Sequence, residues 1–156
     1  MDLFLLLGTS IYFCFVVIIF SGLLFRKKII NTDSNLPLIS VVIAARNEEK
    51  NITYLLNDLV NQSIDKNYLE ILIANDRSSD RTGKIIDQFA IDYSFIKSIH
   101  IDNKHEMAPK KYALTQAINN SSGEIIVATD ADCRVSEDWV KSMGMLVQQT
   151  GKIVIG

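Results

Sequence analysis

Apolar and polar positions divide the chain into two parts. Residues 3–25 contain no charged side chain, whereas from about Ile30 onward short apolar runs alternate with amphipathic runs. An apolar run of about 23 residues would extend about 34 Å as an α-helix, enough to cross a bilayer core of about 30 Å. The pattern therefore predicts one transmembrane helix followed by a domain of alternating strands and helices.

The flanks of the uncharged run decide between an anchor and a cleaved signal peptide. A signal peptide carries a basic segment before a shorter apolar core, but here Asp2 comes first, and Arg26, Lys27 and Lys28 follow the run. A basic flank stays on the cytoplasmic side by the positive-inside rule. We therefore expect residues 1–28 to form a retained single-pass membrane anchor, with the soluble domain in the cytoplasm.

The polar stretch 29–36 is suited to a short linker, and we expect residues 37–156 to form one domain. Alternating strands and helices are typical of an α/β fold, here a Rossmann-like, mostly parallel sheet with helices on both faces. The last apolar run would begin a fifth strand and then stop, so we expect the domain to be truncated. The expected strands are 38–45, 69–74, 95–101, 124–129 and 152–155. Four helices are expected: one that follows Asn47, two that span 79–91 and 109–119, and one that Ser136 caps and that ends at about Gln149.

The first helix of the domain is predicted in more detail. Asn47 is expected to cap it, with Glu48 and Glu49 favourably placed in its first turn. A helical spacing of apolar residues then predicts the stripe that faces the core. This stripe consists of Ile52, Leu55, Leu56 and Leu59.

Charge and cysteine content exclude two classes of function. The chain has 16 Lys and Arg against 18 Asp and Glu, a net charge of -2, and no clustered basic face of the kind that binds nucleic acid. Cys14 lies in the apolar run and Cys133 lies far from it, so the two thiols form neither a disulfide nor a zinc site. The soluble part is therefore expected in a reducing compartment.

Acidic residues follow two of the expected strands, at the edge where open α/β sheets bind ligands. Asp130 and Asp132 flank one small residue, so both can reach one Mg²⁺ or Mn²⁺ ion and leave other positions open for phosphates. If these two aspartates are taken by themselves, a solvated turn between a strand and a helix is the alternative interpretation. Asp76 follows another strand and could instead cap the next helix, although Asp80 could fill that role equally well.

Three segments resemble the family 2 glycosyltransferases of the GT-A type, in the right order and spacing. PLISVVIAARNEEKNI resembles their opening strand and turn, EILIANDRSSDRT their second strand with its acidic turn, and GEIIVATDADC their metal-binding D-x-D segment. The resemblance covers the chain from about Pro37 to its end. It implies an inverting transfer of sugar from a nucleotide sugar, UDP-linked, to a membrane-associated acceptor such as a lipid or polysaccharide, with Mn²⁺ or Mg²⁺ as cofactor.

The resemblance also implies roles for individual side chains of the first two turns. The turn at residues 44–48 would line the nucleotide pocket through Ala44, Arg46 and Glu48. The acidic residue that matches Asp76 recognises a uracil-type base in the family.

The later motifs complete the implied site. Asp130 would lie near the ribose and diphosphate, Asp132 would ligate the metal, and Lys110 would lie near the nucleotide. Two positions depart from the family pattern, since Asn75 replaces a frequent Asp and Pro109 replaces a frequent Gly. The proline stiffens the start of its helix, so a solvated surface lysine remains the alternative for Lys110.

No residue is a good candidate for the general base that an inverting transfer needs. Glu137 and Asp138 are read as structural acids at the start of a helix, and Trp139 as a residue that packs on the sheet. The acidic and histidine residues after the third strand match no helical two-histidine metal site and are read as a polar loop. They are His100, Asp102, His105 and Glu106.

Two other functions remain open at this point. A non-catalytic nucleotide-binding module would keep the same binding residues without turnover. A nucleotidyltransferase would be expected to carry a glycine-rich, basic phosphate loop after the first strand, and AARNEE lacks one. We expect the chain alone to bind a donor without transferring its sugar.

Overall fold

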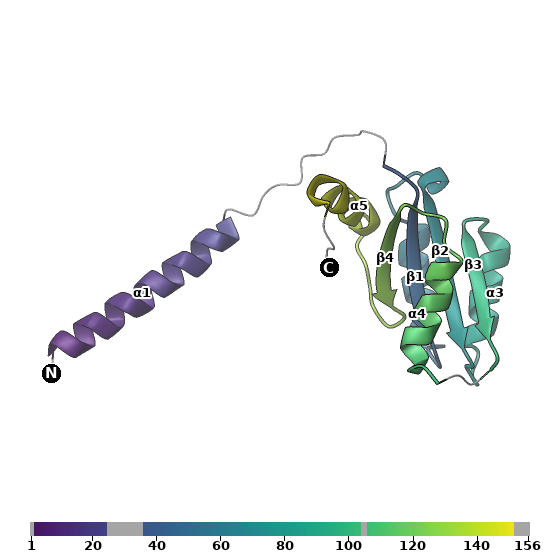
Figure 1. The fold of residues 1–156 in the computed structure, drawn as a ribbon, viewed down its shortest axis with the longest axis horizontal. Coiled ribbons are helices and arrows are strands. Elements are labelled where there is room, and N and C mark those ends of the chain that lie inside the picture. Colours follow the sequence, from purple (N-terminus) through teal and green to yellow (C-terminus); the bar gives the residue numbers. More distant parts are fainter. Residues whose placement is uncertain (1, 25–35, 104–105, 152–156) are drawn as a thin grey trace. The chain divides into compact units, whose positions relative to one another are not determined.

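The protein consists of two compact units, Met1–Asn31 and Thr32–Gly156, each described here by itself. The first unit contains helix α1 (Asp2–Leu24), and the second contains all the strands and remaining helices that the structure describes (Figure 1). In the computed structural model, the described residues are 2–24, 36–103 and 106–151.

The predicted membrane anchor is contradicted. Across the residues that the structure describes, no helix is long and apolar enough to cross a membrane. The expectation of a single-pass membrane protein with a cytoplasmic domain is therefore wrong. Arg26, Lys27 and Lys28, and residues 29–35 of the expected linker, lie outside the described residues.

The second unit is an α/β domain built on a four-stranded sheet in the order β3-β2-β1-β4. All three neighbouring pairs are parallel. The two inner strands are rich in β-branched residues and are buried almost throughout, as expected for strands covered on both faces. The strands are β1 (Ile39–Ala45), β2 (Leu69–Asp76), β3 (Ile96–Ile101) and β4 (Ile125–Asp130), which confirms the first four expected strands, whereas the fifth, at 152–155, lies outside the described residues.

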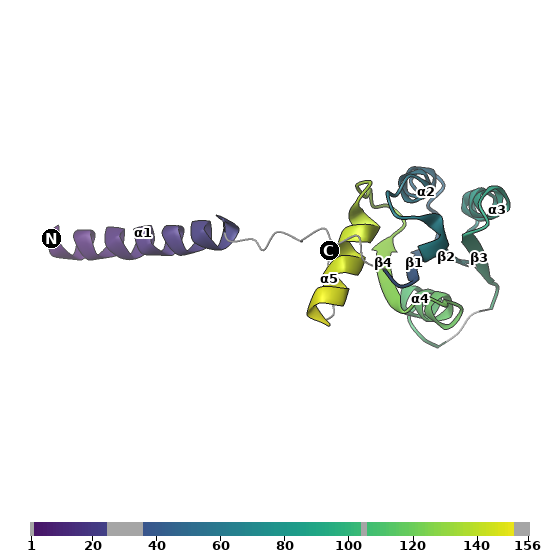
Figure 2. The ribbon, with the colours of Figure 1, turned by 90° about the horizontal axis from the view of Figure 1, so that it is seen from above.

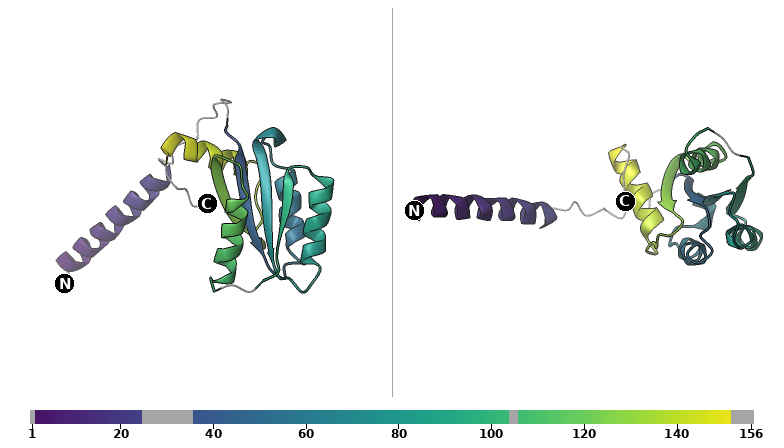
Figure 3. Two further views of the ribbon diagram at one scale, coloured as in Figure 1. Left: turned by 45° about the vertical axis from the view of Figure 1, so that its right-hand side comes forward. Right: turned by 90° about the horizontal axis from the view of Figure 1, so that it is seen from below.

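Helices cover both faces of this sheet. Two helices lie on one face and one lies on the other, while the last helix runs beside β4 (Figures 2 and 3). The main core forms between the sheet and the two helices on its first face, and a smaller core forms between the sheet and the single helix on its second face. The helices are α2 (Ile52–Val60) and α3 (Thr82–Asp92) on the first face, α4 (Pro109–Asn119) on the second, and α5 (Trp139–Thr150) beside β4, with a short 3₁₀ helix at Lys66–Tyr68 before β2.

The apolar stripe of α2 is confirmed, but the predicted cap is wrong. The four buried residues of α2 are the four that its spacing predicts. The helix begins only at Ile52, after Asn51, so Glu48 and Glu49 precede it. Asn47 has a φ of 57° and turns the chain away from β1 in a left-handed conformation that asparagine tolerates.

The predicted cap of the last helix is also wrong. Helix α5 begins at Trp139 with Asp138 in the capping position, but the Asp138 side chain makes no capping hydrogen bond. Ser136 lies one turn earlier, where its carbonyl oxygen accepts a hydrogen bond from the Trp139 N–H at 3.0 Å. Trp139 packs against the main core, as expected.

A buried carboxylate joins the strands at their amino-terminal ends. Glu70 is 5% exposed and accepts hydrogen bonds from the Ser40 hydroxyl, the Ser122 N–H and, at 2.9 Å, the Lys97 ammonium. Gly123 also donates to this carboxylate, at 3.1 Å. A Cβ on Gly123 would lie 2.4 Å from the Ser40 Oγ and 2.7 Å from its N, so only glycine allows the start of β4 to approach β1 this closely.

Candidate functional site

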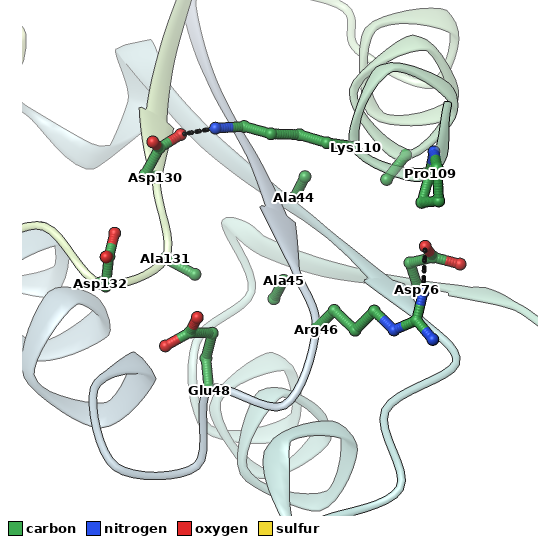
Figure 4. Close-up of a pocket in the computed structure, with 11 residues that line it drawn as sticks. Ala44, Ala45, Arg46, Glu48, Asp76, Pro109, Lys110, Asp130, Ala131 and Asp132 are labelled. Atoms are coloured by element: carbon green, nitrogen blue, oxygen red, sulfur yellow. Dashed lines mark ion pairs between the residues drawn. The ribbon is translucent and has the colours of Figure 1, made fainter. Parts of the chain in front are cut away.

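A cavity of about 300 Å³ opens at the carboxyl-terminal ends of β1, β2 and β4, beside the start of α4 (Figure 4). The order of the strands changes direction between β1 and β4, which is where open α/β sheets bind ligands. The cavity is lined by Ala44, Ala45, Arg46, Glu48, Asp76, Pro109, Lys110, Ala113, Asp130, Ala131 and Asp132. All seven side chains proposed from the sequence are therefore brought together around one space, while their roles remain predictions.

Carboxylates gather on one side of this cavity. Asp130 ends β4, Asp132 follows in the next turn, and Glu48 faces them from the turn after β1 (Figure 4). The Lys110 ammonium reaches across from α4 and lies 2.7 Å from Asp130 Oδ1. The hydrogen bond to Asp130, helped by the charges of Asp130 and Asp132, raises the pKa of Lys110. Lys110 thus lines the cavity as a charged residue paired with Asp130, while its role toward a nucleotide remains a prediction.

The donor chemistry of this side suits a hard divalent cation that is completed by a ligand. Mg²⁺ takes one or two protein carboxylates together with water and substrate phosphates, which fits Asp130 and Asp132. In the described part of the chain, no group of three or more His, Cys, Asp or Glu side chains could hold a metal ion by itself. A metal here would therefore depend on oxygen atoms from a bound nucleotide.

A buried acid occupies the other side of the cavity. Asp76, at the end of β2, is 1% exposed and pairs with the Arg77 guanidinium through contacts of 2.7 and 3.3 Å. The Arg46 Nη1 lies 3.8 Å from Asp76 Oδ2. The capping role considered for Asp76 is filled by Asp80, which accepts the Thr82 N–H at 2.9 Å. The carboxylate of Asp76 is thus kept in the cavity and supplied with positive charge.

Arg77 is a residue of this site that the sequence did not single out. Its φ of 53° is rare for a side chain other than glycine or asparagine. Left-handed backbone at such a position is stored strain of the kind that clusters at functional sites. The only sequence signal was a basic residue directly after Asp76.

Hydrogen bonds fasten the turns after β1 and β2 to each other. The Asn47 N–H donates to the Ser78 hydroxyl at 3.0 Å, and the Ser79 N–H donates to Asn47 Oδ1 at 2.8 Å. The Glu48 N–H donates to the Thr82 hydroxyl at 2.7 Å. These bonds fix the turn that carries Arg46 relative to the strand that carries Asp76, so the cavity wall is rigid at this point.

The described polar residues at the end of β3 and in the turn after it do not line the cavity. His100 Nε2 lies 2.8 Å from Asp87 Oδ1, and its Nδ1 lies 3.3 Å from the Asn75 amide nitrogen. Asn75 therefore faces α3 rather than the ligand side, and its buried Oδ1 has no hydrogen-bond partner among the described residues. His105 lies outside the described residues.

Comparisons with known proteins identify what the domain is similar to. The sequence model described as glycosyl transferase family 2 matches residues 40–156. The probable glycosyltransferase YdaM of Bacillus subtilis is 41% identical over 97 residues, which make up 62% of this chain and 23% of that protein. The beta-monoglucosyldiacylglycerol synthase of Trichormus variabilis is 33% identical over 115 residues, 74% of this chain and 24% of that protein. The chain thus spans about a quarter of the length of each of these relatives.

Solved structures share the fold. Staphylococcus aureus TarS, a poly(ribitol-phosphate) beta-N-acetylglucosaminyltransferase, matches with a TM-score of 0.63 at 25% identity, over 72% of this chain and 20% of that one. Its 1–349 fragment in complex with UDP-GlcNAc matches with a TM-score of 0.60 at 23% identity, over 76% and 37%. The mannosyltransferase PcManGT of Pyrobaculum calidifontis, in complex with GDP-Man and Mn²⁺, matches with a TM-score of 0.63 at 21% identity, over 79% and 35%. The four-stranded α/β domain thus matches the GT-A fold.

Proposed function

The chain belongs to glycosyl transferase family 2, and from this premise we propose that its α/β domain binds the UDP-sugar donor of an inverting, metal-dependent transfer to a lipid or polysaccharide acceptor. The observation that carries the proposal is the single cavity around which all seven side chains converge. A uridine diphosphate has a base at one end and negative charge at the other. The cavity offers a buried acid at one side and a lysine with two carboxylates at the other.

The diphosphate end of the donor would lie beside Asp130, Asp132 and Lys110. Asp132 would ligate the divalent metal, and Asp130 would lie near the ribose and the diphosphate. The ammonium of Lys110, now 2.7 Å from Asp130, would turn to a phosphate oxygen without crossing the cavity. When bound, the metal would act as a Lewis acid that stabilises the departing diphosphate. Lys110 would add a second, fixed positive charge at the same place.

The uracil end would lie against Asp76. The N3–H of uracil is a donor, and the ionised carboxylate of Asp76 is an acceptor that the guanidinium of Arg77 holds in place through two contacts. A base without a donor at this position would leave a buried carboxylate facing an acceptor, which is costly. This arrangement favours uracil over cytosine, whose N3 carries no hydrogen.

The acceptor is proposed from the relatives, whose names describe sugar transfer to a diacylglycerol lipid and to a ribitol-phosphate polymer. Both acceptors present a hydroxyl group as nucleophile, so a general base is needed. Asp138 accepts a hydrogen bond from the Ser63 hydroxyl at 2.6 Å, which supports its reading as a structural acid. No residue of the described domain is assigned as the base.

The base end of the proposal is tested with two nucleotides. Wild-type chain should bind UDP at least about ten times more tightly than CDP in the presence of Mn²⁺, because one unpaired buried group costs about 1–3 kcal/mol. Asp76→Asn should weaken UDP binding and remove most of the preference for UDP over CDP, since an amide can donate to cytosine N3 as well as accept from uracil N3–H. Asp92→Asn, a change of the same kind on α3, should alter neither. Equal calorimetric affinities for UDP and CDP in the wild-type chain would contradict the assignment.

A further inference from the structure

The segment that follows the two aspartates of the cavity rests on α2, a helix that does not line the cavity. The Arg134 guanidinium grips Asp58 of α2 through two bonds, from Nε to Oδ2 at 2.6 Å and from Nη2 to Oδ1 at 2.9 Å. The Val135 N–H donates to the same carboxylate at 3.2 Å. The guanidinium also lies over the ring of Tyr54, 5.5 Å from its centroid. One acid of α2 thus holds both the side chain and the backbone of the segment.

Two residues that follow the end of α2, Gln62 and Ser63, hold the rest of the segment. Gln62 is 4% exposed, and its amide nitrogen donates to the Ser136 carbonyl at 2.7 Å while its oxygen accepts the Val140 N–H at 2.8 Å. The Ser63 N–H donates to the Glu137 carbonyl at 2.9 Å. Asp58, Gln62 and Ser63 together are called the α2 seat. It contacts the segment at almost every residue from 134 to 140.

These contacts replace what the segment lacks by itself. Helix α5 has no side-chain cap of its own, and Gln62, which follows the end of α2, supplies one by accepting the Val140 N–H of its first turn. On the other side, Asp130 and Asp132 stand at the end of β4, which is an edge strand of the four-stranded sheet. Loops keep functional side chains in place when a rigid element supports them.

Resting on the proposed function, we infer that the α2 seat positions Asp132 for the metal and diphosphate of the donor. Asp58 and Gln62 are positioning residues, since they hold residues that follow Asp132, beginning at Arg134, and do not line the cavity. Releasing Arg134 lets the turn move, and Asp132 then loses the fixed geometry that an octahedral cation demands. The base side of the cavity, on β2, stays as it is.

The matched variants are Asp58→Asn and Asp87→Asn. Both remove one carboxylate charge from a helix and break one side-chain partner, Arg134 in the first case and His100 in the second. Asp58→Asn should reduce the gain in UDP affinity that Mn²⁺ confers by about three- to tenfold, less than the roughly 10–100-fold typical of a partner bonded to the metal ligand itself, because Asp58 holds Arg134 rather than Asp132. UDP affinity in EDTA should stay within about twofold, because the base side does not change. Asp87→Asn should leave both affinities at the wild-type value.

A second readout needs neither metal nor nucleotide. Trypsin cleaves after arginine, and Arg134 is held by Asp58 in the folded chain. Asp58→Asn should speed cleavage after Arg134 by about tenfold, since local opening exposes the bond. Arg134→Gln should likewise reduce the gain in UDP affinity that Mn²⁺ confers, because it removes the guanidinium that binds Asp58.

The outcomes separate the inference from the proposed function. Faster cleavage together with a reduced metal-linked gain supports the seat. Equal losses of UDP affinity with and without metal overturn it, because a merely structural role would act on both. Unchanged cleavage after Arg134 also overturns it. A wild-type chain that gains nothing from Mn²⁺ contradicts the proposed function, while the rate of cleavage in Asp58→Asn still decides whether α2 holds the segment.

Discussion

The ion pair between Lys110 and Asp130 illustrates how single residues of the cavity act. Its side chains are 62% and 53% exposed, and their charged atoms are 2.7 Å apart. Exposed pairs of this kind contribute about 0–1 kcal/mol to stability, because water screens them and two long side chains must be ordered. The pair therefore contributes little to folding, and it keeps a lysine beside the carboxylates of the cavity.

Replacing Lys110 separates these two effects. Lys110→Met should change the free energy of unfolding by less than about 1 kcal/mol, but should weaken UDP binding by about tenfold, because a charge-assisted contact to a phosphate is lost. Lys111→Met is the matched control, since the neighbouring lysine is exposed and does not line the cavity. Denaturant titration and calorimetry on both variants check the prediction. Equal UDP affinities for Lys110→Met and Lys111→Met would contradict it.

The placement of the seven cavity residues could be predicted because each lies at a strand end or at the start of a helix, and the ends of parallel strands meet at one edge. Asp76 and Asp130, for example, come from strands far apart in sequence that both pair with or lie next to β1. Arg77 could not be predicted. Its role depends on a left-handed backbone that turns its side chain back toward the preceding acid, and no local pattern specifies that turn.

At the scale of whole elements, strands and the buried stripe of α2 followed from hydrophobic periodicity, whereas the starts of α2, α3 and α5 did not. Local rules favour Asn47 and Ser136 as caps. In the folded domain, Asn47 instead joins the turns after β1 and β2, and Gln62, just after α2, accepts the Val140 N–H of α5. Partners distant in sequence took over the role that a local residue was expected to play. Capping by a residue distant in sequence can be recognised only after the elements have been packed together.

The amino-terminal ends of the strands make a prediction about acid stability. Burial alone would raise the pKa of Glu70, but hydrogen bonds from Ser40, Lys97 and Ser122 outweigh it and lower the pKa to about 2. Because the folded pKa lies below the unfolded value of about 4.5, Glu70 stabilises the fold above that pH and loses its contribution as the pH falls toward 2. The contribution is on the order of 3 kcal/mol.

Glu70→Gln tests this prediction through the pH dependence of unfolding. The variant should be less stable than the wild-type chain at pH 7, and its free energy of unfolding should fall less steeply between pH 5 and about 2. Denaturant titrations at several pH values measure both quantities. Glu124→Gln is a control on an exposed acid near the same end of the sheet. Parallel pH profiles for wild-type chain and Glu70→Gln would contradict the role given to this carboxylate.

At the scale of the whole molecule, the domain separates stability from binding along its strands. The amino-terminal ends are joined through Glu70, while the carboxyl-terminal ends carry the cavity and its charged side chains. The chain spans about a quarter of the length of the relatives compared. Donor binding is the step that we propose for this domain, on the basis of that cavity.

The most direct test of the account is a calorimetric titration of the chain with UDP, in Mn²⁺ and in EDTA, repeated with Asp132→Ala. We expect Mn²⁺ to tighten UDP binding by at least about tenfold in the wild-type chain, since Asp132 would hold the metal and the metal would attract the diphosphate. Asp132→Ala should lose most of that gain while keeping the weaker binding seen in EDTA. UDP binding that is independent of metal and unchanged by Asp132→Ala would contradict the account.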